Sequence, residues 1–269
     1  MSGTSGNKRG LRRLGMSEMR CRAMSNNKQP TTPIVHCITN YVVANFVANG
    51  LVAIGASPIM GDEEREVEDL VQLADALSLN LGTVSERTVR SMKLAGEAAV
   101  KKGIPRVLDP VGAGATAYRL EAANAVIARA RPTLIRCNAG EAAALLGVEW
   151  KGRGVDAGTG EVDGATLAKA LASKYATTVV ISGAVDYISD GKTVLTNLTG
   201  HPDMTRVVGT GCLLSSLLAA WLTKDTSLET IQDGMFRYGR AGERAVQSGI
   251  GGFSNALLEA LIDEEVYTL

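Results

Sequence analysis

The segment Val207–Leu222, with the sequence VVGTGCLLSSLLAAWL, is the stretch around which the rest of the chain is organised. A Gly-Thr-Gly turn leads directly into an apolar stretch of helical length. Small residues let the backbone approach a ligand closely, and the free N–H groups and positive dipole end of a helix N-terminus attract anions. The segment predicts an anion hole at Gly209, Thr210, Gly211 and Cys212. The same pattern also fits a glycine-rich turn that caps a core helix.

Cys212 lies in the first turn of this predicted helix. Helix N-termini favour the thiolate, so we expect this thiol to ionise more readily than a free one, whose pKa is about 8.5. If the turn is only a cap, Cys212 is a buried core cysteine instead.

Upstream of this segment, short β-branched runs alternate with longer helical patterns from Pro33 onward. This alternation is typical of βαβ units and predicts an α/β fold with a mainly parallel sheet and helices on both faces. The predicted strands are 34–38, 57–60, 77–81, 106–108, 134–136 and 178–182. The predicted helices are 41–54, 67–75, 86–102, 119–130, 138–146, 165–175, 212–222, 228–247 and 255–262.

Two glycine motifs do not carry the function that they resemble. Gly191-Lys192-Thr193 looks like the end of a P-loop, but Asp186 stands where its first glycine belongs. The alternating residues 185–189, the turn at 190–191 and residues 192–196 predict a small β-hairpin instead. Gly112-Ala113-Gly114 lacks the third glycine and the downstream acid of a dinucleotide-binding fingerprint. Residues 151–164 are polar and glycine-rich and predict a surface loop.

The composition favours a small-molecule ligand. The chain has 269 residues with 28 basic and 28 acidic side chains, so it has no global field that would attract nucleic acid or an acidic membrane. No apolar stretch reaches the roughly 20 residues needed to span a bilayer. The cysteines show neither zinc-site nor disulfide-framework spacing and predict reduced thiols in a cytoplasmic protein; they are Cys21, Cys37, Cys137 and Cys212.

Residues 1–30 differ from the remainder, residues 31–269, which we expect to form a single domain. The segment is rich in Lys and Arg, has Glu18 as its single acid and shows no apolar periodicity, so we expect a disordered extension. A transit peptide has a similar composition. Met16, Met19 and Met24 lie within this segment. A third interpretation is therefore that the native protein starts at one of these methionines and that the residues before it are not native.

Polar residues follow several predicted strands. Asp109 and the pair Asn138 and Glu141 fall at the carboxyl edge, where open parallel sheets bind their ligands. Two carboxylates and an amide suit Mg²⁺ held largely through waters, and Arg136 close by favours a phosphate. Alternatively, Asp109 only begins a turn before Pro110 and Glu141 only belongs to a first helical turn.

The two histidines do not support a hydrolase triad. His36 lies within a predicted strand, which fits a core or site-lining histidine better than a catalytic base. His201 lies in a loop before Pro202. No Ser-His-Asp arrangement follows from these positions.

Four segments together resemble the hydroxyethylthiazole kinases of thiamine biosynthesis and salvage. They are HCITNYVVANFVANGLVAIGASPIM (36–60), DPVGAGAT (109–116), RCNAGE (136–141) and VVGTGC (207–212). The resemblance covers nearly everything after residue 32. It implies a ribokinase-like fold and the ATP- and Mg²⁺-dependent phosphorylation of the hydroxyethyl group of 4-methyl-5-(2-hydroxyethyl)thiazole.

The resemblance also implies roles for individual residues. It implies substrate contacts at Asn40, Met60 and Gly209, ATP contacts at Arg136 and Ser182, a magnesium environment at Asp109 and Glu141, and a catalytic position at Cys212 beside the substrate hydroxyl. Most ribokinase-like enzymes carry an aspartate base where Cys212 stands, so the cysteine agrees with the thiazole kinases and leaves open whether it is a base or only orients the alcohol. A homotrimer with active sites between subunits is implied as well.

Other functions of the same fold remain as alternatives. A hydroxymethylpyrimidine or pyridoxal kinase is one, and an ATP- or ADP-dependent NAD(P)H-hydrate dehydratase, a lyase, is another; Cys212 in place of aspartate argues against them. A non-catalytic nucleotide or thiazole sensor would not need the full set of Asp109, Glu141, Arg136 and the GTGC turn.

Overall fold

The computed structural model describes Met1 and residues 32–149 and 163–262. Their strands form an eight-stranded sheet in the order β2-β1-β3-β4-β5-β6-β7-β8. The strands are β1 (Ile34–Ile38), β2 (Ser57–Met60), β3 (Ala76–Asn80), β4 (Arg106–Asp109), β5 (Leu134–Asn138), β6 (Thr178–Ser182), β7 (Asp186–Ser189) and β8 (Val194–Asn197). β1 to β6 pair in parallel, and β7 and β8 extend the sheet as an antiparallel hairpin. The predicted strands and hairpin are therefore confirmed, with small differences at their ends.

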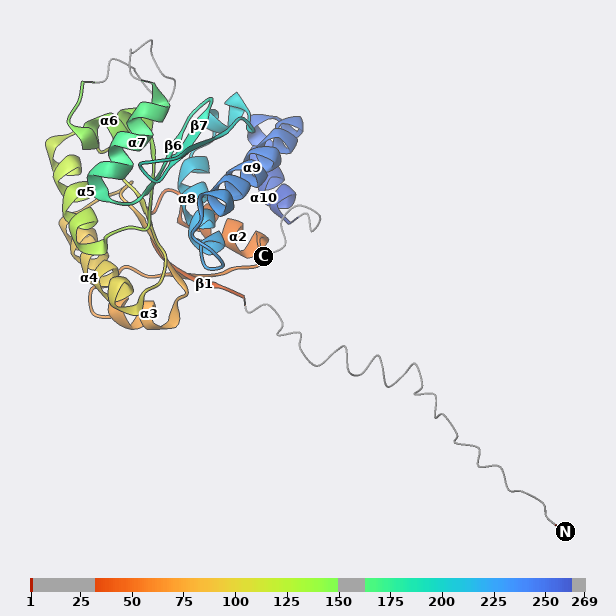
Figure 1. Cartoon of the computed structure of the whole chain (residues 1–269), viewed down its shortest axis with the longest axis horizontal. Helices are drawn as coiled ribbons and strands as arrows, with labels where there is room; N and C mark the ends of the chain where they lie inside the picture. Colours follow the sequence, from red (N-terminus) through yellow and green to blue (C-terminus); the bar gives the residue numbers. More distant parts are fainter. Residues whose placement is uncertain (2–31, 150–162, 263–269) are drawn as a thin grey trace. The chain divides into compact units, whose positions relative to one another are not determined.

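Helices cover both faces of the sheet (Figure 1). The first face carries α2 (Ala44–Ala53), α8 (Thr210–Trp221), α9 (Leu228–Ala245) and α10 (Gly249–Leu261). The second carries α3 (Val67–Leu73), α4 (Glu86–Lys102), α5 (Ala117–Ala130), α6 (Ala139–Leu146) and α7 (Gly164–Tyr175). Two short 3₁₀ segments complete the described part: η1 (Pro202–Arg206) precedes α8, and η2 (Val246–Ser248) follows α9. The predicted helices are all present, which confirms the α/β architecture.

Alternation along each strand divides the core into two clusters. Ala76, Val107 and Leu134 belong to the cluster under α8, whereas their neighbours Leu77 and Leu108 belong to the cluster on the opposite face. Successive side chains of a strand point to opposite faces, so every second residue of β3 to β6 points toward α8. The packing of the apolar residues therefore determines which face of the sheet the polar side chains at the strand ends point toward.

The glycine motif at Gly191 is a hairpin turn, as predicted. Gly191 has a φ of 93° and connects β7 to β8, while Asp190 Oδ1 accepts hydrogen bonds from the N–H groups of Lys192 (2.8 Å) and Thr193 (2.7 Å). Nearly all of the extension at 1–30 and of the loop at 151–164 lies outside the described residues. No helix in the described part of the chain is long and apolar enough to cross a membrane.

His36 is a buried core residue of β1. Its Nε2 atom lies 2.8 Å from the carbonyl oxygen of Gly61, so Nε2 carries the proton and donates it. Nδ1 is buried and has no hydrogen-bond partner. Burial lowers the pKa of His36, because a second proton would place a charge and an unpaired N–H inside the protein. The prediction of a core histidine agrees with these contacts.

We predict that His36 makes the protein less stable at acidic pH. The folded-state pKa is lowered, so the unfolded chain binds more protons, and stability decreases as the pH falls through the unfolded value of about 6.5. Urea unfolding at pH 7.5 and pH 5.0 measures this decrease. The variant His36→Gln, whose amide can donate to Gly61, should show a smaller decrease between the two pH values. An equal decrease in both proteins would contradict the prediction.

Candidate active site

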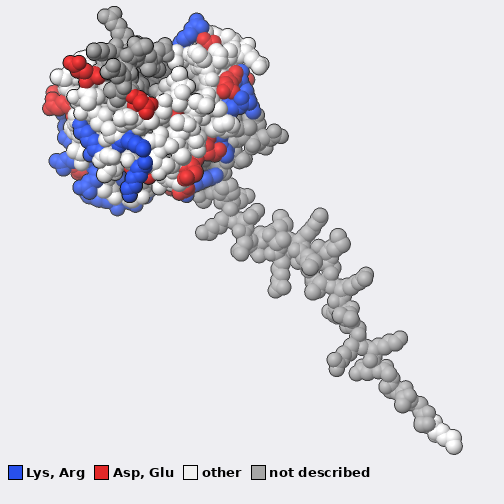
Figure 2. Space-filling view, turned by 45° about the horizontal axis from the view of Figure 1, so that its top comes forward, with Lys and Arg blue, Asp and Glu red and all other residues white. Residues whose placement is uncertain are grey.

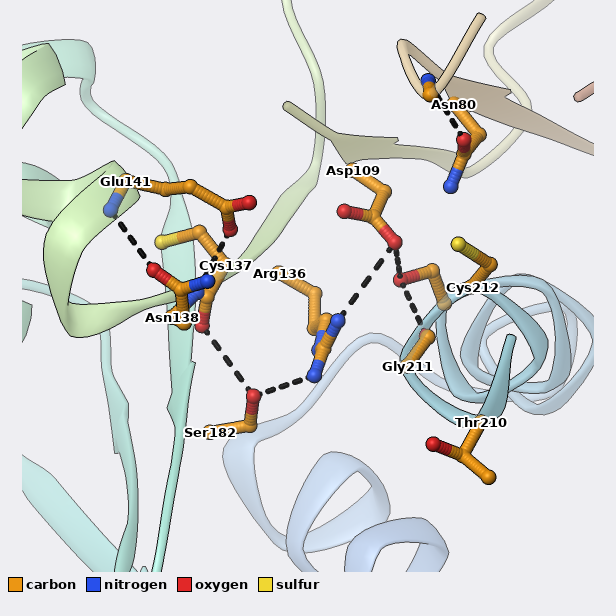
Figure 3. Close-up of polar contacts among 12 residues, drawn as sticks. Asn80, Asp109, Arg136, Cys137, Asn138, Glu141, Ser182, Thr210, Gly211 and Cys212 are labelled. Carbon is orange, nitrogen blue, oxygen red and sulfur yellow. Dashed lines mark hydrogen bonds and ion pairs between the residues drawn. The ribbon is translucent and has the colours of Figure 1, made fainter. Parts of the chain in front are cut away.

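The site begins with the last residues of neighbouring parallel strands. Asn80 ends β3 and pairs in register with Asp109 at the end of β4, and Asn138 at the end of β5 pairs with Ser182 at the end of β6. Each lies two or four residues after a residue that faces α8, so the side chains share that face. Figure 3 shows these side chains converging with Arg136 beside the start of α8. The predicted carboxyl-edge cluster is thus brought together.

The N-terminus of α8 approaches Arg136 closely because of its glycines. Gly209 precedes the helix with a φ of 98°, a left-handed conformation that favours glycine. At Gly211, a Cβ would lie 2.5 Å from Nη1 of Arg136, so a larger residue would displace the guanidinium. The first N–H groups of α8 have no acceptor within the helix. The positive charge of Arg136 and the positive end of the α8 dipole therefore lie side by side.

Arg136 and Asp109 form a buried ion pair. Nη1 of Arg136 lies 3.6 Å from Oδ2 of Asp109, and these side chains are 14% and 1% exposed. Arg136 Nη2 also donates to the hydroxyl of Ser182, and Ser215 on α8 donates to Asp109 Oδ2 at 2.8 Å. Burial raises the pKa of the Asp109 carboxyl, and the charge of Arg136 opposes this shift. The pair holds a positive charge at the mouth of the α8 turn.

Glu141 stabilises two backbone segments. Its Oε2 accepts from the N–H of Asn138 (2.9 Å) and its own N–H donates to Asn138 Oδ1 (2.8 Å), which is a capping box at the start of α6. Its Oε1 accepts from the N–H of Gly112 (2.8 Å) in the loop after β4. Burial and the charge of Asp109 raise the pKa of the Glu141 carboxyl. Two nearby buried carboxylates of like charge would be stabilised by a cation between them.

Asp109 retains an acceptor for such a cation. Its Oδ1 is buried and has no hydrogen-bond partner. In Figure 3, this is the oxygen without a dashed line, on the side that faces Glu141. The described residues contain no cluster of three or more His, Cys, Asp or Glu side chains that would enclose a metal. The donors therefore fit Mg²⁺, which binds through one or two carboxylates and keeps most of its waters.

A cavity of about 390 Å³ opens beside this cluster. Its walls come from the ends of β4 to β6, the α8 turn, residues 198–205 and α9, and they include Asp109, Arg136, Glu141, Ser182 and Cys212. The volume lies in the range of small-molecule sites. The predicted phosphate-binding residues Arg136, Ser182 and Cys212 all contribute to its walls.

Two cavity residues had no motif to indicate them. Tyr238 is fully buried, and its hydroxyl donates at 2.7 Å to the carbonyl of Thr210, which fixes the start of α8. Asp186 is buried and accepts from the N–H of Gly183 (3.0 Å) and from Asn197 (2.8 Å). Burial raises the pKa of both side chains. Neither residue belongs to a recognisable motif. The sequence signal for Asp186 is its position at the start of an apolar strand, and Tyr238 has no comparable signal.

The other predicted site residues divide into two groups. Asn40 is buried and donates to Cys212 Sγ at 3.6 Å, so it lies beside the site. Met60 ends the edge strand β2, is 39% exposed and does not line the cavity. Gly209 packs against Val43 rather than against the cavity. The described structure gathers Asn40 with Cys212 but leaves Met60 apart from them.

Comparison with known proteins decides the family. The model of the Hydroxyethylthiazole kinase family matches residues 26–265. The chain belongs to this family. A hydroxyethylthiazole kinase from Lysinibacillus sphaericus is 46% identical over 232 residues, covering 85% of this chain and 91% of that protein. The hydroxyethylthiazole kinase of Halalkalibacterium halodurans is 44% identical over 245 residues, covering 88% and 94%.

Solved structures agree with the hydroxyethylthiazole kinase assignment. A hydroxyethylthiazole kinase protein from Pyrococcus horikoshii superposes with a TM-score of 0.79 at 39% identity, covering 87% of this chain and 90% of that chain. Pyridoxal kinase from Staphylococcus aureus in complex with ADP gives a TM-score of 0.60 at 17% identity, covering 79% of this chain and 88% of that chain. The latter shows a shared fold alone, which is the ribokinase-like fold that the sequence predicts.

The described surface carries charged side chains of both signs. On the face shown in Figure 2, basic and acidic side chains both occur and neither sign covers the face. The formal net charge of the whole chain is +0.

The expectation of an easily ionised Cys212 is wrong. The pKa of this thiol is raised to about 11, mainly by burial and also by the charge of Asp109. Asn80, Arg136 and Asn40 lower the pKa by smaller amounts. The dipole of α8 does not compensate for the burial of the thiol and the charge of the nearby carboxylate. Cys37, Cys137 and Cys212 are free thiols, as predicted for these three.

We therefore predict slow alkylation of Cys212. With a pKa of about 11, only a very small fraction is thiolate at pH 7.5, and the thiolate is the reactive form. Peptide mapping after iodoacetamide treatment should show a Cys212 rate far below that of N-acetylcysteine in the same tube, still rising between pH 8 and pH 10. A rate that levels off near pH 7 would contradict the raised pKa.

Proposed function

We propose that this protein transfers the γ-phosphoryl group of ATP to the hydroxyl of 4-methyl-5-(2-hydroxyethyl)thiazole, giving the thiazole phosphate used to make thiamine phosphate. Family membership supports the reaction. The observation that carries the site assignment is the buried Arg136–Asp109 pair against the glycine turn of α8, with Cys212 in the same turn. The positive charge that would bind a phosphoryl group thus lies beside the thiol that would contact the alcohol.

The cavity would hold the triphosphate of ATP. Arg136 and Ser182, which are hydrogen-bonded to each other, form one wall, and the start of α8 forms another. The N–H groups of the predicted anion hole that line the cavity, those of Thr210, Gly211 and Cys212, and the Arg136 guanidinium would neutralise charge on the oxygens of the transferred group. Phosphoryl transfer depends mainly on such positioning and charge stabilisation.

Asp109 and Glu141 would hold Mg²⁺ through waters and through oxygens of the bound nucleotide. The free Oδ1 of Asp109 and the raised pKa of both carboxyls support this role. When bound, the ion would neutralise negative charge on the phosphates.

Cys212 would orient the alcohol rather than act as its base. A thiol with a pKa of about 11 is protonated at neutral pH and has little capacity to accept a further proton. In the transfer, the alcohol oxygen forms the new bond to the γ-phosphorus, and the bond to the β,γ-bridging oxygen breaks with its electron pair leaving on ADP. The alcohol proton departs late, to an oxygen of the transferred phosphate. A loose transition state makes early removal of this proton unnecessary.

We also propose the assembly that the family resemblance implies, a homotrimer with active sites between subunits. Met60 at the end of β2 and the nearby Tyr41 and Val42, after the neighbouring strand β1, are exposed apolar side chains at the same sheet edge. With a partner subunit covering them, Met60 and Gly209 would line an intersubunit site in which they contact the substrate. We further propose residues 31–269 as a single domain and the cytoplasm as its location.

The first test is thiazole-dependent consumption of ATP in Mg²⁺ buffer, with mass spectrometry of the product. We expect a phosphate ester of the hydroxyethylthiazole. Hydroxymethylpyrimidine, pyridoxal and hydrated NADH serve as competing substrates in parallel reactions. A reaction with one of these and none with the thiazole would overturn the proposal but leave the fold unaffected.

Substitutions should separate charge from orientation. We expect Cys212→Ala to lower kcat by roughly tenfold, because positioning is lost but the charge at the phosphoryl group remains. Arg136→Lys should cost roughly 100-fold or more, since the bidentate guanidinium geometry is lost. Cys37→Ala, which removes a buried thiol outside the cavity, is the control. A thousandfold loss in Cys212→Ala, with fold and binding intact, would favour an obligatory base instead.

A further inference from the structure

Two buried amides lie behind Cys212 and hold each other in one orientation. Asn40, which follows β1, donates from Nδ2 to Oδ1 of Asn80 at 2.8 Å. The N–H of Gly82 donates to the same oxygen at 3.0 Å. An amide flip of Asn80 would place its NH₂ group against two donors, so the contacts exclude the flipped orientation. The identity and direction of its Nδ2 atom are thereby fixed.

That Nδ2 atom is a buried donor without a partner. Asn80 is 3% exposed, and its Nδ2 makes no hydrogen bond within the described structure. Figure 3 shows the nitrogen directed into the space between Asp109 and Cys212. It is near enough to both to lower their pKa values, but its geometry makes no hydrogen bond to either. A buried unpaired donor is costly and needs an explanation in function.

The surroundings select the kind of acceptor. Asp109 Oδ2 already interacts with Ser215 and Arg136, and Cys212 Sγ already accepts from Asn40. A hydroxyl group can accept from Asn80 and donate its own proton to one of these neighbours, whereas an ether or carbonyl has no proton to give. The side chains around this position thus match both the acceptor and the donor function of a hydroxyl group.

We infer that Asn80 Nδ2 donates a hydrogen bond to the oxygen of the acceptor alcohol and holds that oxygen next to Cys212 for attack on the γ-phosphorus. This inference rests on the proposed function and adds a residue to it. One lone pair of the alcohol oxygen accepts from Asn80, and the other forms the bond to phosphorus. Asn40 acts as a positioning residue, because it fixes the orientation of the Asn80 amide.

The test compares two ligands that differ only in the hydroxyl. Calorimetry without ATP gives the Kd of 4-methyl-5-(2-hydroxyethyl)thiazole and of 4-methyl-5-ethylthiazole for the full chain and for Asn80→Ala. We expect the variant to bind the hydroxyl compound roughly tenfold more weakly, the size of one net hydrogen bond, with little change for the ethyl compound. A role confined to structure would change both affinities alike.

Ser78→Ala is the matched control. Ser78 lies on the same strand and the same face as Asn80, is equally buried, and contacts Ser216 of α8 at 2.9 Å. Its substitution removes a buried contact between β3 and α8 but leaves the Asn40–Asn80 pair in place, so it should lower stability and leave the ratio of the two Kd values unchanged.

The outcomes separate the inference from the proposed function. If the unaltered protein phosphorylates the thiazole but Asn80→Ala keeps the Kd ratio, the inference alone is overturned. If the unaltered protein neither binds nor phosphorylates the thiazole, the proposed function falls and the inference with it. Should Asn80→Ala not fold, a crystal structure of the unaltered protein with the hydroxyethylthiazole decides. A distance of about 3 Å between Nδ2 and the alcohol oxygen supports the inference, and one well beyond hydrogen-bonding range overturns it.

Discussion

Arg136 is a cation buried inside the protein, and the arrangement of the site depends on keeping it charged. Burial would lower the pKa of its guanidinium, but the negative charges of Asp109 and Glu141 outweigh burial and keep that pKa above its ordinary value. A buried charge of this kind persists only when its partners are held in place. The sheet supplies Asp109 from the neighbouring strand, and the capping box of α6 supplies Glu141.

The same requirement explains the backbone of the turn before α8. The guanidinium occupies the space that a side chain at position 211 would need, so glycine is required there. The helix begins directly against the charge, and Tyr238 fixes its first carbonyl from α9. Three elements distant in sequence, β5, α8 and α9, thus meet at one small volume. The result is a guanidinium with little freedom to rearrange.

The sequence predicted the fold well because its signals were local. β-Branched runs and helical periodicity located the strands and helices, and the polar residues after the strands located Asp109, Asn138 and Glu141. What escaped prediction depends on three-dimensional surroundings. The direction of the pKa shift of Cys212 depends on burial and on a carboxylate from another strand, and neither follows from a position at a helix start.

Asn80 shows a limit of a different kind. The strand Ala76–Asn80 alternates small or polar residues with leucines, so its polar face was visible in the sequence. The unpaired Nδ2 depends on Asn40 and Gly82, which occupy the other half of the amide, and no pattern within the strand reveals them. Asp186 escaped similarly, because its partners Gly183 and Asn197 belong to the turn and strand that flank it.

The two-residue alternation of β3 to β6 means that the core and the active site share one register. Removing a single residue inside β3 would turn Asn80 toward the opposite helices and expose leucines to the site face. Over evolutionary time, changes of length within these strands should therefore be rare. The side chains at the strand ends thus owe their common facing to the pleat of the sheet.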